Sequence, residues 1–179
     1  MRCFIAIDLP EEIKSKIFHK FENLQDKNLF RGKLTEKENL HLTLKFLGSL
    51  TNEEIKIIKE KLREIKFGKF SCDIGKIGIF DEHYIKIIWV ELLSDKLNEL
   101  RNKIDEATSE IPMGHEKFTS HITVLRVKSV IDKQKLLEGI KKINFKNLNF
   151  KIKEFLLMKS ELMRQGPKYK ILGKFNLEN

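Results

Sequence analysis

The stretch Asn39-Leu40-His41-Leu42-Thr43-Leu44-Lys45-Phe46-Leu47-Gly48 decides how this chain is interpreted, because a second version of it occurs later. The echo is Phe118-Thr119-Ser120-His121-Ile122-Thr123-Val124-Leu125-Arg126-Val127. Both stretches place a His-x-Thr triplet in a run of aliphatic residues, which predicts a β-strand. Side chains alternate across a strand, so each histidine shares a face with its threonine and the aliphatic residues back them. The repeat favours one site with two matching halves over two unrelated, half-exposed strand histidines.

The elements around the two triplets follow the same order in each half of the chain. Hydrophobic periodicity predicts strands at 2–9, 39–48, 67–80, 84–93, 118–127, 148–159 and 169–177, and helices at 11–29, 52–65, 95–109 and 132–143. Thr51 and Glu54 form a capping-box pattern at the start of the second helix. Residues 31–38 are expected to be a polar connection, and 160–167 a turn-rich one.

The spacing supports a duplication. Ile5 precedes His41 by 36 residues, and Ile85 precedes His121 by 36 residues. We therefore predict an α+β fold made of a duplicated, bilobal unit with pseudo-two-fold symmetry. Two antiparallel-rich sheets would flank a central cleft, with the helices outside. Residues 1–179 would be one domain of two intertwined lobes, about 1–80 and 84–179.

The composition indicates a globular protein with a polyanionic partner. The 179 residues are long enough to bury a core, and 34% of them are charged. The 35 basic and 26 acidic residues give a formal charge of +9, which favours nucleic acid as the partner. Only 6 of the basic residues are arginine, and lysines spread over helices also suit a solvated surface or a thermophile.

Cysteines and the N-terminus predict an intracellular setting. Cys3 and Cys72 lack CxxC spacing and are expected to be buried strand residues, with no disulfide framework. The first apolar run is interrupted by Asp8, which is too early for a signal peptide or a membrane-spanning helix. We expect a cytoplasmic monomer with no membrane partner.

Two histidines facing each other across a cleft suit concerted general acid–base chemistry. One imidazole would take a proton from a nucleophile such as water while the other gives one to the leaving group. The hydroxyls of Thr43 and Thr123 could donate to phosphate oxygens. Neither histidine stands in a cluster of Asp, Glu or Cys, so we expect no metal and no cofactor.

These motifs resemble those of the 2H phosphoesterase superfamily, specifically the RNA 2′,3′-cyclic phosphodiesterases also called 2′-5′ RNA ligases. The similarity extends to Met1-Arg2-x-Phe4-Ile5-Ala6-Ile7 and to Ser160-x-Leu162 followed by Gly166-Pro167-x-Tyr169. It implies hydrolysis of a terminal 2′,3′-cyclic phosphate to a 2′-phosphate, with weak reversible 2′-5′ joining of RNA ends. It also implies His41 as proton donor and His121 as proton acceptor. Ser120 departs from the family, where proline often precedes the second histidine, so the entry of that strand is open.

Other residues carry weaker signals. Arg126 follows the second triplet, as in the family, but alternation puts it on the face opposite His121. It would reach the cleft to bind phosphate only if the strand bulges, twists or ends there, and otherwise would form a salt bridge at the rim. Phe46 and Trp89 are expected to be core residues. His19, His83 and His115 are expected at the surface, with His115 able to border the cleft.

Two alternatives remain open at this stage. A nucleotide- or RNA-binding module of the same fold could have lost useful turnover, although binding alone does not require two imidazoles so placed. A phosphodiesterase could instead act on a small cyclic phosphate or a 2′-5′ oligonucleotide.

Overall fold

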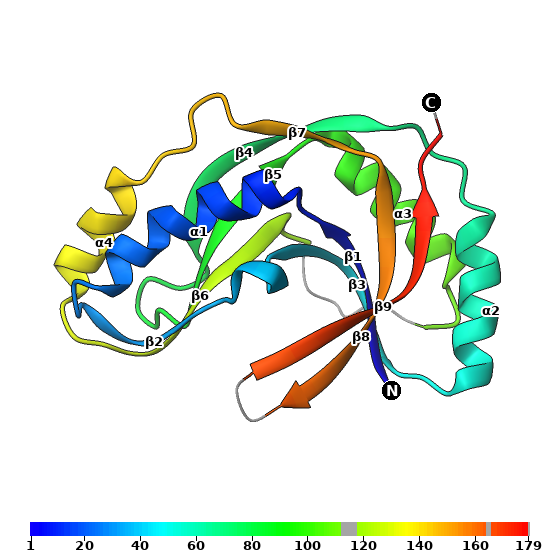
Figure 1. Cartoon of the computed structure of the whole chain (residues 1–179), viewed down its shortest axis with the longest axis horizontal. Coiled ribbons are helices and arrows are strands. Elements are labelled where there is room, and N and C mark those ends of the chain that lie inside the picture. The colour runs from blue at the N-terminus through cyan, green and yellow to red at the C-terminus, as the bar shows by residue number, and fades with distance from the viewer. Residues whose placement is uncertain (112–117, 164–165, 179) are drawn as a thin grey trace.

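The structure is a computed structural model that describes residues 1–111, 118–163 and 166–178. These residues form a strongly curled sheet and four α-helices (Figure 1). The strands are β1 (Arg2–Asp8), β2 (Phe30–Leu34), β3 (His41–Ser49), β4 (Phe70–Ile79), β5 (Ile87–Leu93), β6 (His121–Val130), β7 (Asn149–Ile152), β8 (Glu154–Met163) and β9 (Gly166–Asn176). The helices are α1 (Glu11–Gln25), α2 (Asn52–Arg63), α3 (Asp95–Ala107) and α4 (Lys133–Lys142), and a 3₁₀ turn, η1 (Lys37–Asn39), precedes β3.

The sheet is continuous and antiparallel. Its order is β7–β4–β5–β6–β3–β1–β8–β9, and β2 pairs with the far part of β6. The expectation of two separate sheets is therefore wrong. The two halves of the sheet are nevertheless joined narrowly, because β3 and β6 pair only at Leu42 and Ile122 before they diverge.

The four helices cover one face of the sheet. Their apolar stripes, such as Ile13, Ile17 and Phe21 on α1, merge into one buried core with the inward side chains of the strands. Thr51 caps α2 through the expected capping box, in which its hydroxyl accepts from the Glu54 backbone N–H. The opposite face of the sheet carries a small buried cluster of Phe4, Ala6, Leu156 and Met158, and it is this face that holds the cleft.

Strands are exchanged between the two halves of the chain. β4 follows the first His-x-Thr strand but pairs with β5 and β7, which come later. β8 comes near the end of the chain and pairs with β1 at its start. The helices mix in the same way, since α1 packs on α4 and α2 packs on α3. Each half of the sheet is thus built from both halves of the sequence.

Two expected connections and one expected strand differ in the structure. Residues 31–38 begin with β2, an edge strand whose exposed Arg31, Gly32 and Lys33 hide the usual alternation. Gly32 is required there, because a Cβ would stand 2.3 Å from the Arg126 carbonyl oxygen. The strand expected at 148–159 is split at Lys153, where the chain leaves β4 and crosses to β1. The stretch expected as a turn at 160–167 mostly belongs to the long β8–β9 hairpin.

Candidate active site

The site lies where β3 and β6 meet. Leu42 and Ile122 are fully buried against the helices, so the residues on either side of them face the cleft. The antiparallel register then sets His41 beside Thr123 and Thr43 beside His121. All four side chains are half-buried and line the cleft. The structure thus brings together the two triplets that the sequence repeat singled out.

Both imidazoles are held by the backbone in the same way. The Nδ1–H of His41 donates to the Asn39 carbonyl at 2.7 Å, and that of His121 donates to the Thr119 carbonyl at 2.7 Å. A carbonyl oxygen can only accept, so each Nδ1 carries a proton and each Nε2 is the nitrogen free for chemistry. At His41 this Nε2 lies 3.1 Å from the Thr43 hydroxyl.

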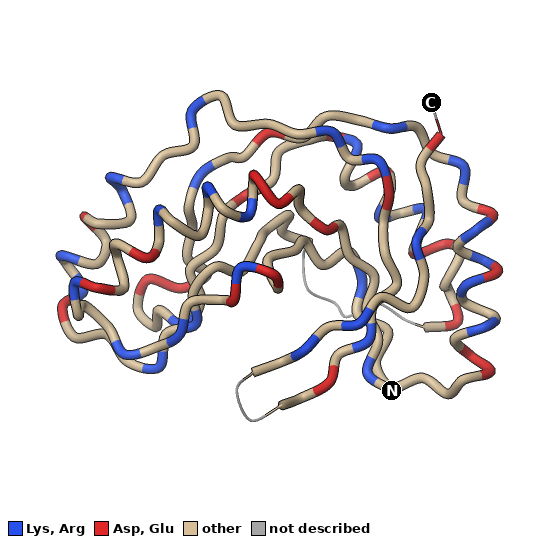
Figure 2. The backbone as a smooth tube through the Cα atoms, in the orientation of Figure 1, with Lys and Arg blue, Asp and Glu red and all other residues tan. Residues whose placement is uncertain are grey.

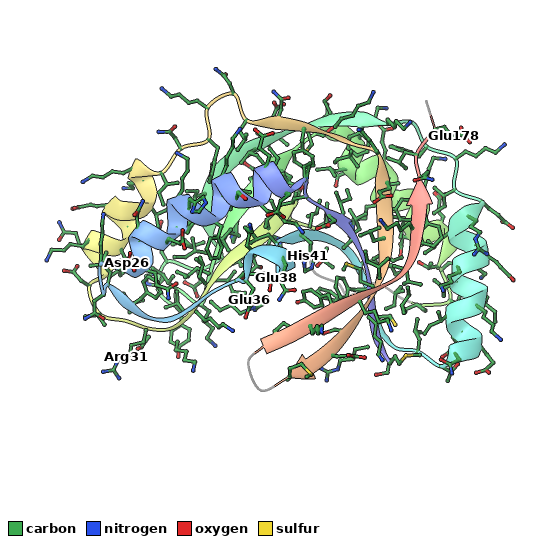
Figure 3. The ribbon with its side chains drawn as sticks, viewed as in Figure 1. Asp26, Arg31, Glu36, Glu38, His41 and Glu178 are labelled. Carbon is green, nitrogen blue, oxygen red and sulfur yellow. The ribbon has the colours of Figure 1, made fainter. Side chains whose placement is uncertain are left out.

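Asn39 also connects His41 to the β8–β9 hairpin. Its side-chain amide donates to the Pro167 carbonyl at 3.0 Å, while its own carbonyl accepts the hydrogen bond from His41 Nδ1–H. The same amide donates to the carboxylate of Glu36, the residue before η1, at 3.3 Å, and Figure 3 labels Glu36, Glu38 and His41 in this region of the molecule. The hairpin is thereby fixed against the residue that orients the imidazole.

Aromatic rings flank each histidine. His41 lies between Phe4 and Tyr169, with ring centroids 5.1 Å away in each case. His121 lies against Phe80 at 5.0 Å and Trp89 at 6.1 Å. The two sets of rings come from different elements: Phe4 lies on β1 and Tyr169 on β9, whereas Trp89 lies on β5 and Phe80 directly follows β4.

This apolar surround lowers the pKa of both histidines. Burial is the main cause at each ring, because it disfavours the charged imidazolium. The hydrogen bonds to the Asn39 and Thr119 carbonyls act in the opposite direction, and the Arg126 charge lowers both pKa values further. His41 differs from His121 in one respect: the Asp8 carboxylate raises its pKa, partly offset by Lys14. Asp8 pairs with Lys14 at 2.6 Å.

A bulge in each motif strand decides which later residues reach the cleft. Pairing of β3 with β1 skips Leu44, and pairing of β6 with β5 skips Val124. Phe46 and Arg126, each five residues after its histidine, are thereby turned to the cleft face. The expectation that Phe46 is a core residue is wrong, because its side chain is 74% exposed. Simple alternation puts Arg126 on the face opposite His121, and the bulge at Val124 brings it to the cleft face.

The remaining sequence candidates lie outside the centre. Trp89 is buried as expected, although it packs on His121 rather than in the main core. His19 is exposed beside Glu22 on α1, and the exposed His83 lies in the Asp81 turn. His115 falls outside the described residues. Ser120 enters β6 smoothly, since its carbonyl accepts from the Leu92 N–H at 3.0 Å.

The cleft extends well beyond the two histidines. Its volume is about 990 Å³, near the top of the range for ligand sites of about 300–1,000 Å³. Three of the six arginines in the chain line it, namely Arg2, Arg101 and Arg126. Sequence reasoning missed Phe4, Asn39, Phe80 and Tyr169 as neighbours of the histidines. Phe4 and Tyr169 belong to the two terminal stretches that resemble the family, but nothing in those stretches indicated that their rings contact His41.

Two further properties of the described residues bear on the chemistry. No three His, Cys, Asp or Glu side chains among them gather closely enough to hold a metal ion. Within the same ranges, no helix is both long and apolar enough to cross a membrane.

Comparisons with known proteins agree with this geometry. The family model described as LigT like Phosphoesterase matches residues 7–89 and again residues 90–169, consistent with duplicated halves. The chain is 36% identical over 177 residues to the RNA 2′,3′-cyclic phosphodiesterase of Methanocaldococcus jannaschii, covering 96% of this chain and 98% of the relative. It is 34% identical over 187 residues to the protein of the same name from Thermotoga maritima, covering 99% and 96%. In structure it is similar to E. coli LigT complexed with ATP, with a TM-score of 0.77, 25% identity and coverage of 99% and 98%.

Proposed function

Because this chain belongs to the LigT-like phosphoesterase family, we propose that it is an RNA 2′,3′-cyclic phosphodiesterase that opens the cyclic phosphate to a 2′-phosphate. The observation that carries this proposal is the pair of matched His-x-Thr strands meeting at Leu42 and Ile122 inside one cleft. Two relatives that are 36% and 34% identical over nearly their whole length are named RNA 2′,3′-cyclic phosphodiesterase.

The reaction needs an acid and a base on opposite sides of phosphorus. His121 Nε2 takes a proton from water, whose oxygen forms a bond to phosphorus as the bond from phosphorus to O3′ breaks. His41 Nε2 gives its proton to the departing O3′. The products are a 3′-hydroxyl and a 2′-phosphate, with His41 neutral and His121 protonated. Proton exchange with solvent then restores both imidazoles.

The neighbouring polar groups suit the phosphate. Thr43 and Thr123 stand across from the opposite histidines, where their hydroxyls can donate to the two non-bridging oxygens. Arg126 brings a guanidinium to the same face, and within the described residues it forms no ion pair with a carboxylate. A guanidinium with free donors is well suited to hold phosphate in two-point contact. Arg126 therefore serves substrate binding and charge stabilisation.

Phe46 suits the nucleobase. It is exposed on the cleft face, on the same strand as His41 and next to the Phe4 ring at 6.2 Å. A free aromatic face beside a phosphate site is a stacking platform for any base, because every base has a π-face. The nucleoside belongs on the His41 side, since the O3′ that His41 protonates is part of its ribose.

The surroundings favour His41 as the acid. An acid must be protonated before it can act, and the Asp8 carboxylate stabilises the imidazolium of His41. Of the carboxylates in the described chain, none acts on the pKa of His121 in this way. The base must be neutral, which suits His121; burial and Arg126 lower the pKa of both histidines, so Asp8 is the feature that distinguishes His41 from His121.

The test is product analysis on a short RNA that ends in a 2′,3′-cyclic phosphate. The wild-type protein should yield only the 2′-phosphate, and His41→Ala and His121→Ala should each reduce the rate by about 10²–10⁴-fold. The double variant should be little slower than either single one, because the two histidines act as a unit. Turnover should persist in EDTA. Full activity in either single variant would contradict the two-histidine site.

A further inference from the structure

We propose that the RNA upstream of the cyclic phosphate lies along one particular arm of the cleft, with its phosphates bound by Lys128 and Lys33. We call this arm the β2–β6 wing, lined by Lys33, Leu34, Thr35, Arg126, Val127 and Lys128. This inference rests on the proposed function and assigns a direction to the bound strand.

The cleft has two arms because the motif strands diverge. β3 and β6 run antiparallel and pair only at Leu42 and Ile122, so their later residues lead away in opposite directions. β6 leads to Arg126 and Lys128, beside β2. β3 leads to Phe46 and Ser49, beside Arg2 at the start of β1. We call this second arm the β1–β3 wing.

The shape of a ribose distributes its substituents between the two arms. The 2′ and 3′ oxygens form one edge of the ring, which must point at the histidine pair. The base on C1′ and the C5′ carbon on C4′ then leave from opposite ends of the ring. If the base stacks on Phe46 in the β1–β3 wing, the 5′ phosphate is directed into the β2–β6 wing.

The charges of the β2–β6 wing fit this assignment. Lys33 is paired with Arg126 in the β2–β6 register, and Lys128 follows Arg126 on the side away from the buried Val127. Lys33 contacts Glu36, whereas no ion pair links Lys128 to a carboxylate in the described part of the chain. Figure 2 shows Lys and Arg gathered along β2 and the adjoining part of β6. An unneutralised cation lining a cleft binds phosphate at the lowest desolvation cost.

Not every cation on β2 belongs to this wing. Arg31 extends outward from the edge of the sheet, away from the cleft (Figure 3). In the opposite wing, the Arg101 guanidinium lies over the Phe118 ring, 4.6 Å from its centroid. Arg2 remains as the exposed cation of the β1–β3 wing, and it is therefore the matched comparison for Lys128.

The experiment compares two substrates in wild type and variants. One is a 2′,3′-cyclic mononucleotide, which has no upstream phosphate, and the other is a trinucleotide ending in the same cyclic nucleotide. The readout is the ratio of kcat/KM for the trinucleotide to that for the mononucleotide. Lys128→Gln should lower this ratio about fivefold, and should reduce the slope of log kcat/KM against log salt for the trinucleotide by about 0.7. Arg2→Gln and Lys56→Gln, the latter on the outer helix α2, should leave the ratio unchanged.

The outcomes separate the inference from the proposed function. A ratio that falls in Arg2→Gln but not in Lys128→Gln would assign the RNA to the β1–β3 wing and overturn the inference. An equal ratio in all variants would overturn it as well. If wild type hydrolyses neither substrate, the proposed function fails. Calorimetric binding of a trinucleotide 2′-phosphate to the same variants then decides the inference alone: weaker binding only in Lys128→Gln supports it, and any other pattern overturns it.

Discussion

The two histidines share a tautomer but not an electrostatic environment. In each, Nδ1–H donates to a backbone carbonyl and leaves Nε2 for proton transfer, and each has a pKa lowered from the ordinary value of 6.5 mainly by burial. The sequence was enough to predict both histidines as site residues, because the His-x-Thr repeat can be recognised without knowing the fold. It could not supply the burial or the Asp8 charge, which depend on strands β1 and β5 packing beside the motif strands.

These shifts predict the pH dependence. Activity requires one protonated and one neutral imidazole, so kcat/KM should be bell-shaped with its maximum midway between two macroscopic pKa values. Both lie below 6.5 in the free protein, so the maximum should lie below pH 6.5. The kcat profile should be shifted to higher pH, because the bound phosphate anion stabilises the imidazolium.

Asp8→Asn removes the charge that raises the pKa of His41, so one limb of the kcat/KM profile should move to lower pH while the other stays. Movement of both limbs, or a kcat/KM maximum well above pH 6.5, would contradict this reading.

At the scale of elements, the bulges in β3 and β6 explain where simple alternation fails. The extra residue at Leu44 or Val124 reverses the parity of the residues that directly follow it, and no pattern in a single sequence marks its position. Simple alternation therefore predicts Phe46 in the core, and it leaves Arg126 open between the cleft and a salt bridge at the rim. The division of the expected strand 148–159 into β7 and β8 at Lys153 could not be predicted either. The chain changes from pairing with β4 to pairing with β1 there, and no turn residue marks the change.

The reversed parity of Phe46 has a measurable consequence. Phe46→Ala should raise KM for a 2′,3′-cyclic mononucleotide by about fivefold or more, because stacking of one base contributes about 1–3 kcal/mol. The effect on kcat should be smaller, because Phe46 does not contact the reacting atoms. Ile57→Ala, which truncates an exposed side chain on α2, serves as the control and should not change KM. An unchanged KM in Phe46→Ala would show that the base lies elsewhere.

The same bulge turns Lys45 into the core, where it fastens α3 to β3. Its side chain is nearly fully buried, and its ammonium pairs with Asp105 at 2.6 Å and donates to the Thr108 carbonyl at 3.0 Å. Lys45→Met keeps the length of the side chain but loses these contacts, and should lower the free energy of unfolding by about 1–3 kcal/mol in urea titration. Lys56→Met on the exposed face of α2 should change it by less than about 0.5 kcal/mol. Equal stabilities of the two variants would mean that the buried ammonium contributes nothing.

At the scale of the whole molecule, the exchange of β4 and β8 makes the two halves interdependent. The duplication was readable in the sequence from equal spacing, whereas the exchange was not, because a strand's partners leave no local pattern. Residues 1–80 alone would leave β4 without β5 and β7, and β1 without β8. We expect this fragment and residues 84–179 to be unfolded separately by circular dichroism and to regain structure when mixed. Independent cooperative unfolding of either fragment would contradict intertwined lobes.

The matched His-x-Thr strands present similar imidazoles to the cleft, so the proton roles depend on what differs around each ring. The assignment of His41 as acid depends on the Asp8 carboxylate, which raises the pKa of His41, and on the roles that the family resemblance implies. A substrate with a much better leaving group in place of the 3′ oxygen hardly needs protonation at that position. His41→Ala should regain much of its lost rate on such a substrate, whereas His121→Ala should remain impaired because water still needs a base. Comparing the two variants on natural and activated substrates measures this directly, and rescue of His121→Ala instead would reverse the roles while leaving the two-histidine site intact.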